Sequence, residues 1–142
     1  MSADHWNALD AAVFAQLTGS SALGAFLNGG TTGVFYGVAP GTAVPPYVVF
    51  NQQAGVPRHT INGAIAYEAA LYQVKGITRS PSSKTAGQIA DAIDDVLDNA
   101  ALTVSGHTHM HTRRTSDVKF VEVDAGEVYQ HAGAMYRVLA HP

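Results

Sequence analysis

The sequence predicts a single α+β domain of 142 residues, in which a mainly antiparallel sheet packs against two helices. Three observations support this fold class. Apolar residues recur with a period of 3.6 from Ala86 to Ala100, which indicates an amphipathic helix. Two runs rich in β-branched side chains flank Gly126, which indicates a hairpin near the end of the chain. The chain is 46% hydrophobic and 13% charged, which is typical of a globular domain with a core.

Three segments are predicted to be helical. Apolar residues recur on one stripe from Trp6 to Leu17, so we expect an N-terminal helix over residues 4–17. The residues Thr18–Ser21 end this helix and are expected to cap a second, short helix over residues 22–27. The clearest helix is expected over residues 83–100, after a start signal at Ser80–Ser83.

Five strands are expected from runs of β-branched and aromatic residues, at 34–36, 47–50, 65–78, 118–123 and 128–139. Residues 65–78 are apolar on both faces, so this strand is expected at the centre of the sheet. The short connections between consecutive strands predict antiparallel pairing. The stretch Ile65–Tyr72 contains no Lys or Pro to protect a free edge, which favours burial of this edge against a neighbouring subunit.

Three long loops are expected between these elements, at residues 37–46, 51–63 and 103–117. The first contains three prolines and two glycines. The second is polar and rich in turn-forming residues, and long loops without secondary structure are usually functional or mobile. We therefore expect residues 51–63 to reach a neighbouring molecule.

Composition excludes several classes of function. Eight basic and 11 acidic residues give a net charge of −3, and Arg113–Arg114 is only a local basic pair, which argues against duplex DNA as a direct ligand. The absence of cysteine excludes disulfides, thiolate metal ligands and a thiol nucleophile. No apolar run approaches the roughly 20 residues that cross a bilayer, and the first residues do not resemble a signal peptide. A soluble protein kept in the cytoplasm is expected.

Three alternating histidines, His107, His109 and His111, are the candidates for a metal site. On a regular strand they would point to the same side, and imidazole binds zinc, copper, nickel and iron. A metal site would need further ligands and neighbouring groups that hold each imidazole ring, and the candidates Asp117, Glu122 and His131 offer no distinctive spacing. The alternatives are an exposed polar segment without function and a pH-sensitive contact between subunits.

Four aspartates, Asp91, Asp94, Asp95 and Asp98, share one broad face of the main predicted helix. The simplest interpretation is a solvated outer face, opposite the stripe of Ile89, Ile93 and Val96. In a ring, the same face could form a negative surface between subunits or along the lumen.

Other catalytic patterns are absent from the sequence. No serine lies in a Gly-X-Ser-X-Gly motif, and the glycine-rich residues 28–33 lack a following lysine and precede a strand. Six tyrosines lie on or beside the predicted strands, where they suit either core packing or contacts between subunits. These residues therefore point to binding and not to catalysis.

The order of the elements, with several specific segments, resembles a known family. The resemblance covers roughly residues 5–139 and rests on Val34–Pro40, Val44–Phe50, the helix Thr85–Leu97, Asp124–Gly126, His131 and Tyr136–Val138. These segments are similar to the tail-completion proteins, or tail terminators, of long-tailed bacteriophages and gene transfer agents. The segment Gly106–His111 departs from the family pattern because it is richer in histidine.

The resemblance implies a structural virion protein that is not an enzyme and needs no cofactor or metal. Its subunits are expected to form a ring, most simply a hexamer, that caps the tail tube, stops its polymerisation and joins it to the head-neck proteins. DNA would be only a passing cargo in the lumen, and no membrane would be involved. The expected location is the head–tail junction of the virion, after assembly in the host cytoplasm.

Seven residues are candidates for contacts with other subunits or with the tube, because they lie in or beside the expected loops and strand edges: Tyr36, Tyr47, Gln53, Arg58, His59, Arg113 and Arg114. Two other classes of function stay open from the residues alone. One is a small metal-binding domain or metal-dependent enzyme that uses His107, His109 and His111. The other is a dimeric module with a ligand pocket between sheet and helices. Within the resemblance, head-closure and tail-adaptor roles also stay open.

Overall fold

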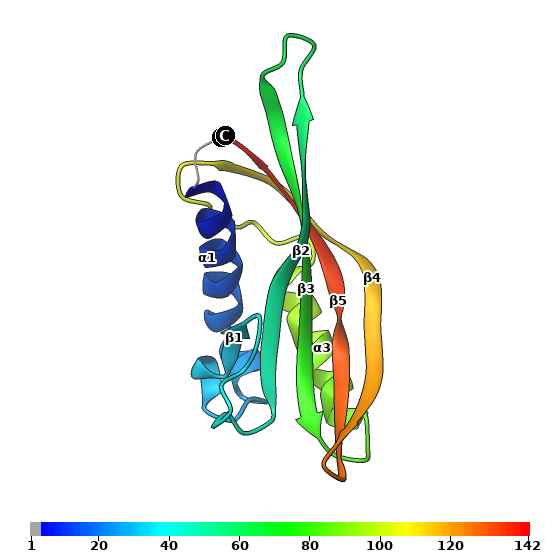
Figure 1. Ribbon diagram of the computed structural model, residues 1–142. Helices are drawn as coiled ribbons and strands as arrows, with labels where there is room; N and C mark the ends of the chain where they lie inside the picture. The colour runs from blue at the N-terminus through cyan, green and yellow to red at the C-terminus, as the bar shows by residue number, and fades with distance from the viewer. Residues whose placement is uncertain (1–3) are drawn as a thin grey trace.

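A computed structural model describes the backbone of residues 4–142 and the side chains from Asn7 onward (Figure 1). Among these residues the helices are α1 (Asp4–Thr18), α2 (Ser21–Gly24), the 3₁₀ helix η1 (Gly30–Thr32) and α3 (Lys84–Leu97). The strands are β1 (Val34–Tyr36), β2 (Tyr47–His59), β3 (Ile65–Arg79), β4 (Thr108–Asp124) and β5 (Glu127–His141). No helix in this part of the chain is long and apolar enough to span a bilayer.

One sheet contains all the described strands, in the order β1-β2-β3-β5-β4. Its pairs are antiparallel except for β1 and β2, so the predicted α+β fold with a mainly antiparallel sheet is confirmed. The expectation that consecutive strands are all antiparallel is wrong at β1, where Val34 pairs in parallel with Val48. Residues 37–46 form a loop as predicted, and this loop is long enough to return the chain so that β2 runs in the same direction as β1.

Strand β3 lies at the centre of the sheet, as its apolar character on both faces predicts. It pairs with β2 from Ile65 to Ile77 and with β5 from Glu68 to Arg79. The proposed burial of an Ile65–Tyr72 edge against a neighbouring subunit is therefore wrong for most of this stretch, because strands of the same chain cover it. The free edges belong to β4 and, beyond its short pairing with β1, to β2.

The core lies between one face of the sheet and the helices α1 and α3. Three side chains of α1 (Leu9, Val13 and Leu17) and three of α3 (Ile89, Ile93 and Leu97) are buried against β2, β3 and β5. The stripe predicted for the first helix is thus confirmed at these α1 positions, while Phe14 is partly exposed and the Trp6 side chain lies outside the described residues. Gly76 allows α3 to approach β3 closely, since a Cβ atom there would lie 2.3 Å from Ile89 Cγ2.

Two of the expected long loops are largely strands, and these predictions are wrong. Strand β2 continues through His59 and pairs with β3 as far as Ile65, so residues 51–63 form most of a hairpin. Strand β4 begins at Thr108, within the expected loop 103–117, and pairs with β5 throughout. These segments lack the alternation of apolar and polar residues that indicates a strand, because strands exposed on both faces bury no side chains. Only their backbone hydrogen bonds to the neighbouring strand make them strands.

The helix boundaries differ from the expected ones by small amounts. Helix α3 ends at Leu97 because Asp98 is extended and Asn99 has a positive φ of 61°. The short second helix covers only Ser21–Gly24, and the Ser20 side chain caps it by accepting a hydrogen bond from the Leu23 amide at 3.1 Å.

Candidate assembly surfaces

A hairpin arm, residues 53–67 of β2 and β3, projects beyond the rest of the sheet (Figure 1). Three predicted contact residues, Gln53, Arg58 and His59, lie on it, and their side chains are exposed. Ile61 lies in the turn at its tip and is fully exposed. The arm therefore presents basic and apolar side chains to solvent, which is typical of a surface that binds another molecule.

The loop 37–46 lies against the face of the sheet that α1 and α3 leave uncovered. Together with Tyr47, Ile77 and Tyr129 it lines a shallow pocket. The Tyr47 ring is half-buried and packs edge-on against Phe35, with 5.8 Å between ring centroids. Of the two predicted contact tyrosines, Tyr36 is the more exposed, at 51%. Tyr47 instead serves mainly to hold this loop.

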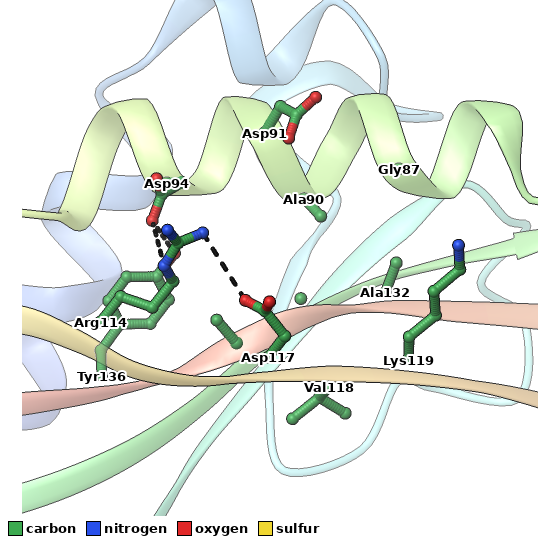
Figure 2. Close-up of a pocket in the computed structure, with 12 residues that line it drawn as sticks. Gly87, Ala90, Asp91, Asp94, Arg114, Asp117, Val118, Lys119, Ala132 and Tyr136 are labelled. Carbon is green, nitrogen blue, oxygen red and sulfur yellow. Dashed lines mark hydrogen bonds and ion pairs between the residues drawn. The ribbon is translucent and has the colours of Figure 1, made fainter.

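The predicted contact residues Arg113 and Arg114 lie on β4, and each forms an ion pair with an aspartate in the segment 94–98. Arg114 Nε is 3.7 Å from Asp94 Oδ1, and the Arg114 guanidinium also pairs with Asp117 at 3.6 Å (Figure 2). Arg113 Nε is 3.7 Å from Asp98 Oδ1, which also accepts a hydrogen bond from the Arg114 amide at 2.9 Å. The two arginines therefore connect the edge strand to the helix within one subunit.

The aspartate face of α3 is divided between two roles. Asp91 and Asp95 are exposed, as a solvated face predicts. Asp94 and Asp98 are half-buried and bind groups of the sheet, so the solvated interpretation is wrong for these two. The reason is the position of β4, which passes close enough to α3 for its arginines to reach the carboxylates. The sequence does carry opposite charges at residues 94–98 and 113–114, which is a signal for this contact. The two segments are far apart in the chain, however, so the sequence does not show that they meet.

Two buried tyrosines connect the sheet to both helices, and sequence reasoning did not single them out. The Tyr72 hydroxyl donates to Asp10 Oδ1 at 2.5 Å, and the Tyr136 hydroxyl donates to Asp94 Oδ1 at 2.9 Å. Burial raises the pKa of both hydroxyls above their usual range, and the hydrogen bonds to the carboxylates raise the pKa further. Both tyrosines thus belong to the core and not to a contact surface.

The three alternating histidines do not share one face of β4. A bulge between His109 and His111 places His109 opposite Ala140 and His111 opposite Leu139, so the two side chains point to opposite sides of the sheet. His109 Nε2 lies 2.6 Å from Thr112 Oγ1, and burial lowers the pKa of His109. Among residues 4–142 as described, no group of three or more His, Asp or Glu side chains is placed to hold a metal ion. The predicted same-side arrangement is wrong.

A second polar cluster lies on the face of the sheet that the helices leave uncovered. The buried His131 ring stacks on Phe120 at a centroid distance of 4.2 Å, and its Nε2 is 2.9 Å from Glu122 Oε1. Lys75 Nζ lies 4.8 Å above the Phe120 ring. Burial lowers the pKa of His131, and the hydrogen bond that Glu122 accepts from its ring opposes this change. This arrangement joins β3, β4 and β5.

A groove lies between α3 and the strands β4 and β5, with a volume of about 210 Å³ (Figure 2). Five of its twelve lining residues are small: Gly87, Ala90, Ala132, Gly133 and Ala134. The charged group of Arg114, Asp94 and Asp117 closes one end, and Lys119 extends toward Gly87 at the other (Figure 2). The described residues thus offer projecting and concave surfaces suited to protein contacts.

Comparison with known proteins agrees with these features. The family model described as tail completion protein gp17 matches residues 11–139, so the chain belongs to this family of phage tail structural proteins. A solved chain of the virion of a native gene transfer agent particle has a TM-score of 0.81 and 23% identity, over 99% of this chain and 100% of that one. A second solved structure has a TM-score of 0.57 and 17% identity, over 93% of this chain and 94% of that one. No curated protein matches the chain.

Membership of the family confirms the resemblance stated from the sequence. The family consists of structural virion proteins, which argues against an enzyme. The two solved structures, both below 25% identity, establish the shared fold alone.

Proposed function

We propose that this protein forms a ring that caps the finished tail tube, stops its polymerisation and joins the tail to the neck proteins of the head. The ring contains six copies. It lies at the head–tail junction of the virion and assembles there from subunits made in the host cytoplasm. The single observation that carries the proposal is the family match over residues 11–139.

The shape of the subunit supports assembly into a ring. A closed ring needs heterologous contacts, in which one patch of a subunit meets a different patch of the next. The hairpin arm and the groove beside α3 are two such different patches on one chain. The likeness to a chain of a gene transfer agent virion supports a place in the particle.

The charge of the subunit supports a passive relation to DNA. A net charge of −3 provides little attraction for phosphates, so DNA would pass through the lumen without being held. The same low net charge causes little repulsion between subunits. The proposed partners are therefore further copies of this chain, the tube protein and a neck protein.

Imaging of labelled particles tests the proposal. An antibody or a small tag on this protein should mark one position per tail, at the end that meets the head. Cells that lack the protein should accumulate tails that are unjoined to heads and irregular in length. Label distributed along the tube, or particles that join normally without the protein, would contradict the proposal.

A further inference from the structure

The end of the hairpin arm has no support from the rest of the described chain. Strand β3 pairs with β5 only from Glu68 onward, so residues 58–67 pair only with each other. A two-stranded ribbon alone is marginally stable in water. Its tip nevertheless carries Ile61 in full exposure, next to Arg58 and His59. An apolar side chain at the end of an unsupported ribbon gains stability when it is buried against a partner.

The groove between α3 and β4–β5 has room for such a side chain. Its volume is about 210 Å³, and a cavity of about 150 Å³ already accepts a molecule the size of benzene. Gly87 lies in α3, where a glycine costs helix stability relative to alanine. A Cβ atom at Gly87 would meet no atom within 4 Å. Packing within the described residues therefore does not require glycine there, and the missing side chain keeps the groove open.

The charges of the arm and of the α3 rim are complementary. The arm carries Arg58 and His59, and the sequence has no Asp or Glu from residue 51 to residue 67. The outer side of α3 exposes Asp91 and Asp95, and Figure 2 shows Asp91 on the rim, while Ala90 points into the groove. The other charged residues of the groove are Lys119 and the group in which Arg114 already pairs with Asp94 and Asp117.

We propose that Ile61 at the arm tip of one subunit docks into the α3–β4 groove of a second copy, with Arg58 facing Asp91 on the rim. This inference rests on the proposed ring and identifies the contact that builds it. Because the arm and the groove are different surfaces of one chain, each copy offers one of each, and the contact propagates head to tail until a ring closes.

Crosslinking of the full chain tests the contact, and the absence of native cysteine makes every introduced thiol unique. The double variant Ile61→Cys/Ala90→Cys should give a ladder of covalent multimers with a short bismaleimide. The matched control is Ile61→Cys/Ala11→Cys, because Ala11 is exposed on α1, away from the groove. The control should give no ladder, because Ala11 is not near the position that the docked arm tip occupies. A ladder from the control that equals that of the groove pair would overturn the inference.

Self-association of two further variants, measured by analytical ultracentrifugation, provides an independent test. Ile61→Asp and Gly87→Leu should each weaken association about tenfold or more, because one removes the apolar anchor and the other fills the groove. Val38→Asp and Ala11→Leu are the controls and should change it less than about twofold, since both positions are exposed. Thermal unfolding of each variant verifies that the fold is retained.

The outcomes separate this inference from the proposed function. A ring that forms without the groove crosslink, or that tolerates both Ile61→Asp and Gly87→Leu, overturns the arm–groove contact and leaves the ring in place. A chain that stays monomeric and gives no ladder at any concentration overturns the contact as well. Crosslinking of Ile61→Cys to a different virion protein in assembled particles would do the same. Particle imaging decides the ring's location independently of these results.

Discussion

Tyr72 and Tyr136 lie directly opposite each other in the ladder between β3 and β5, and each donates a hydrogen bond to an aspartate of a different helix. Both side chains are buried, Tyr72 against α1 and Tyr136 against α3. The pair therefore orients both helices on the same part of the sheet. Since the arm and the groove lie on elements that this pair connects, it also determines how the two proposed contact surfaces are placed in one subunit.

The tyrosine pair should make the protein sensitive to alkaline pH. The folded-state pKa of each hydroxyl is raised above the unfolded value of 10.0, so its contribution is fully present below about pH 10 and is lost as pH rises further. In urea unfolding measured from pH 8 to 11.5, the free energy of unfolding should begin to fall near pH 10 and then approach a fall of about 1.4 kcal/mol per pH unit for each tyrosine. Tyr136→Phe should make this fall shallower, because the variant lacks one of the two buried hydroxyls. Equal slopes in the two proteins would contradict the assignment.

Asp94 should contribute more to stability than Asp91, although both lie on α3. Asp94→Ala leaves the buried Tyr136 hydroxyl without its acceptor and removes a partner of Arg114, so we expect a loss of about 1–3 kcal/mol. Asp91→Ala changes an exposed side chain and should alter stability by less than about 0.5 kcal/mol. Chemical denaturation of the two variants compares them directly. Similar values would show that the contact between α3 and the sheet does not depend on Asp94.

Gly76 should not tolerate a side chain. Gly76→Ala would place a methyl group 2.3 Å from Ile89 Cγ2, so β3 and α3 must separate, at a cost of about 1–3 kcal/mol. Ile89→Ala in the same chain removes Cγ2, the nearest atom, so the double variant should lose less than the sum of the two single losses. Gly41→Ala is the matched control, because no atom lies within 4 Å of its Cβ position. Thermal and urea unfolding give the comparison, and a fully stable Gly76→Ala variant would disprove the close approach.

His109 and His111 should respond differently to substitution. His109→Asn removes the hydrogen bond to Thr112 of β4 and the one that His109 Nδ1 accepts from the Leu102 amide in the loop before β4, and should cost about 0.5–1.5 kcal/mol. His111→Asn alters an exposed side chain and should be neutral within about 0.5 kcal/mol. Added zinc should restore neither, because the bulge separates the two side chains. Recovery of stability with micromolar zinc would instead support a metal site.

Much of the fold follows from local patterns in the sequence. The 3.6 period of Ala86, Ile89 and Ile93 predicts α3, and the turn signal at Gly126 predicts the last hairpin, where its φ is 81°. Apolar character on both faces correctly places β3 at the centre of the sheet. These features are local because burial of a helix face or a strand face imposes a period on neighbouring residues.

Of the seven predicted contact residues, the sequence alone placed Gln53, Arg58 and His59 in one exposed segment, and the structure keeps them together on the arm. It did not show that this segment is a hairpin, since a ribbon exposed on both faces carries no apolar period. Nor did it show that Arg113 and Arg114 bind the aspartates of α3 within the same chain.

Tertiary structure decided the remaining features because each depends on a distance between segments that are far apart in the chain. Tyr72 meets Asp10 across 62 positions, and Tyr136 meets Asp94 across 42. The groove exists only where Gly87 of α3 passes over Ala132 and Gly133 of β5. Local propensity determines which segments become helices and strands, while the packing of those segments determines which polar groups meet and which surfaces stay open.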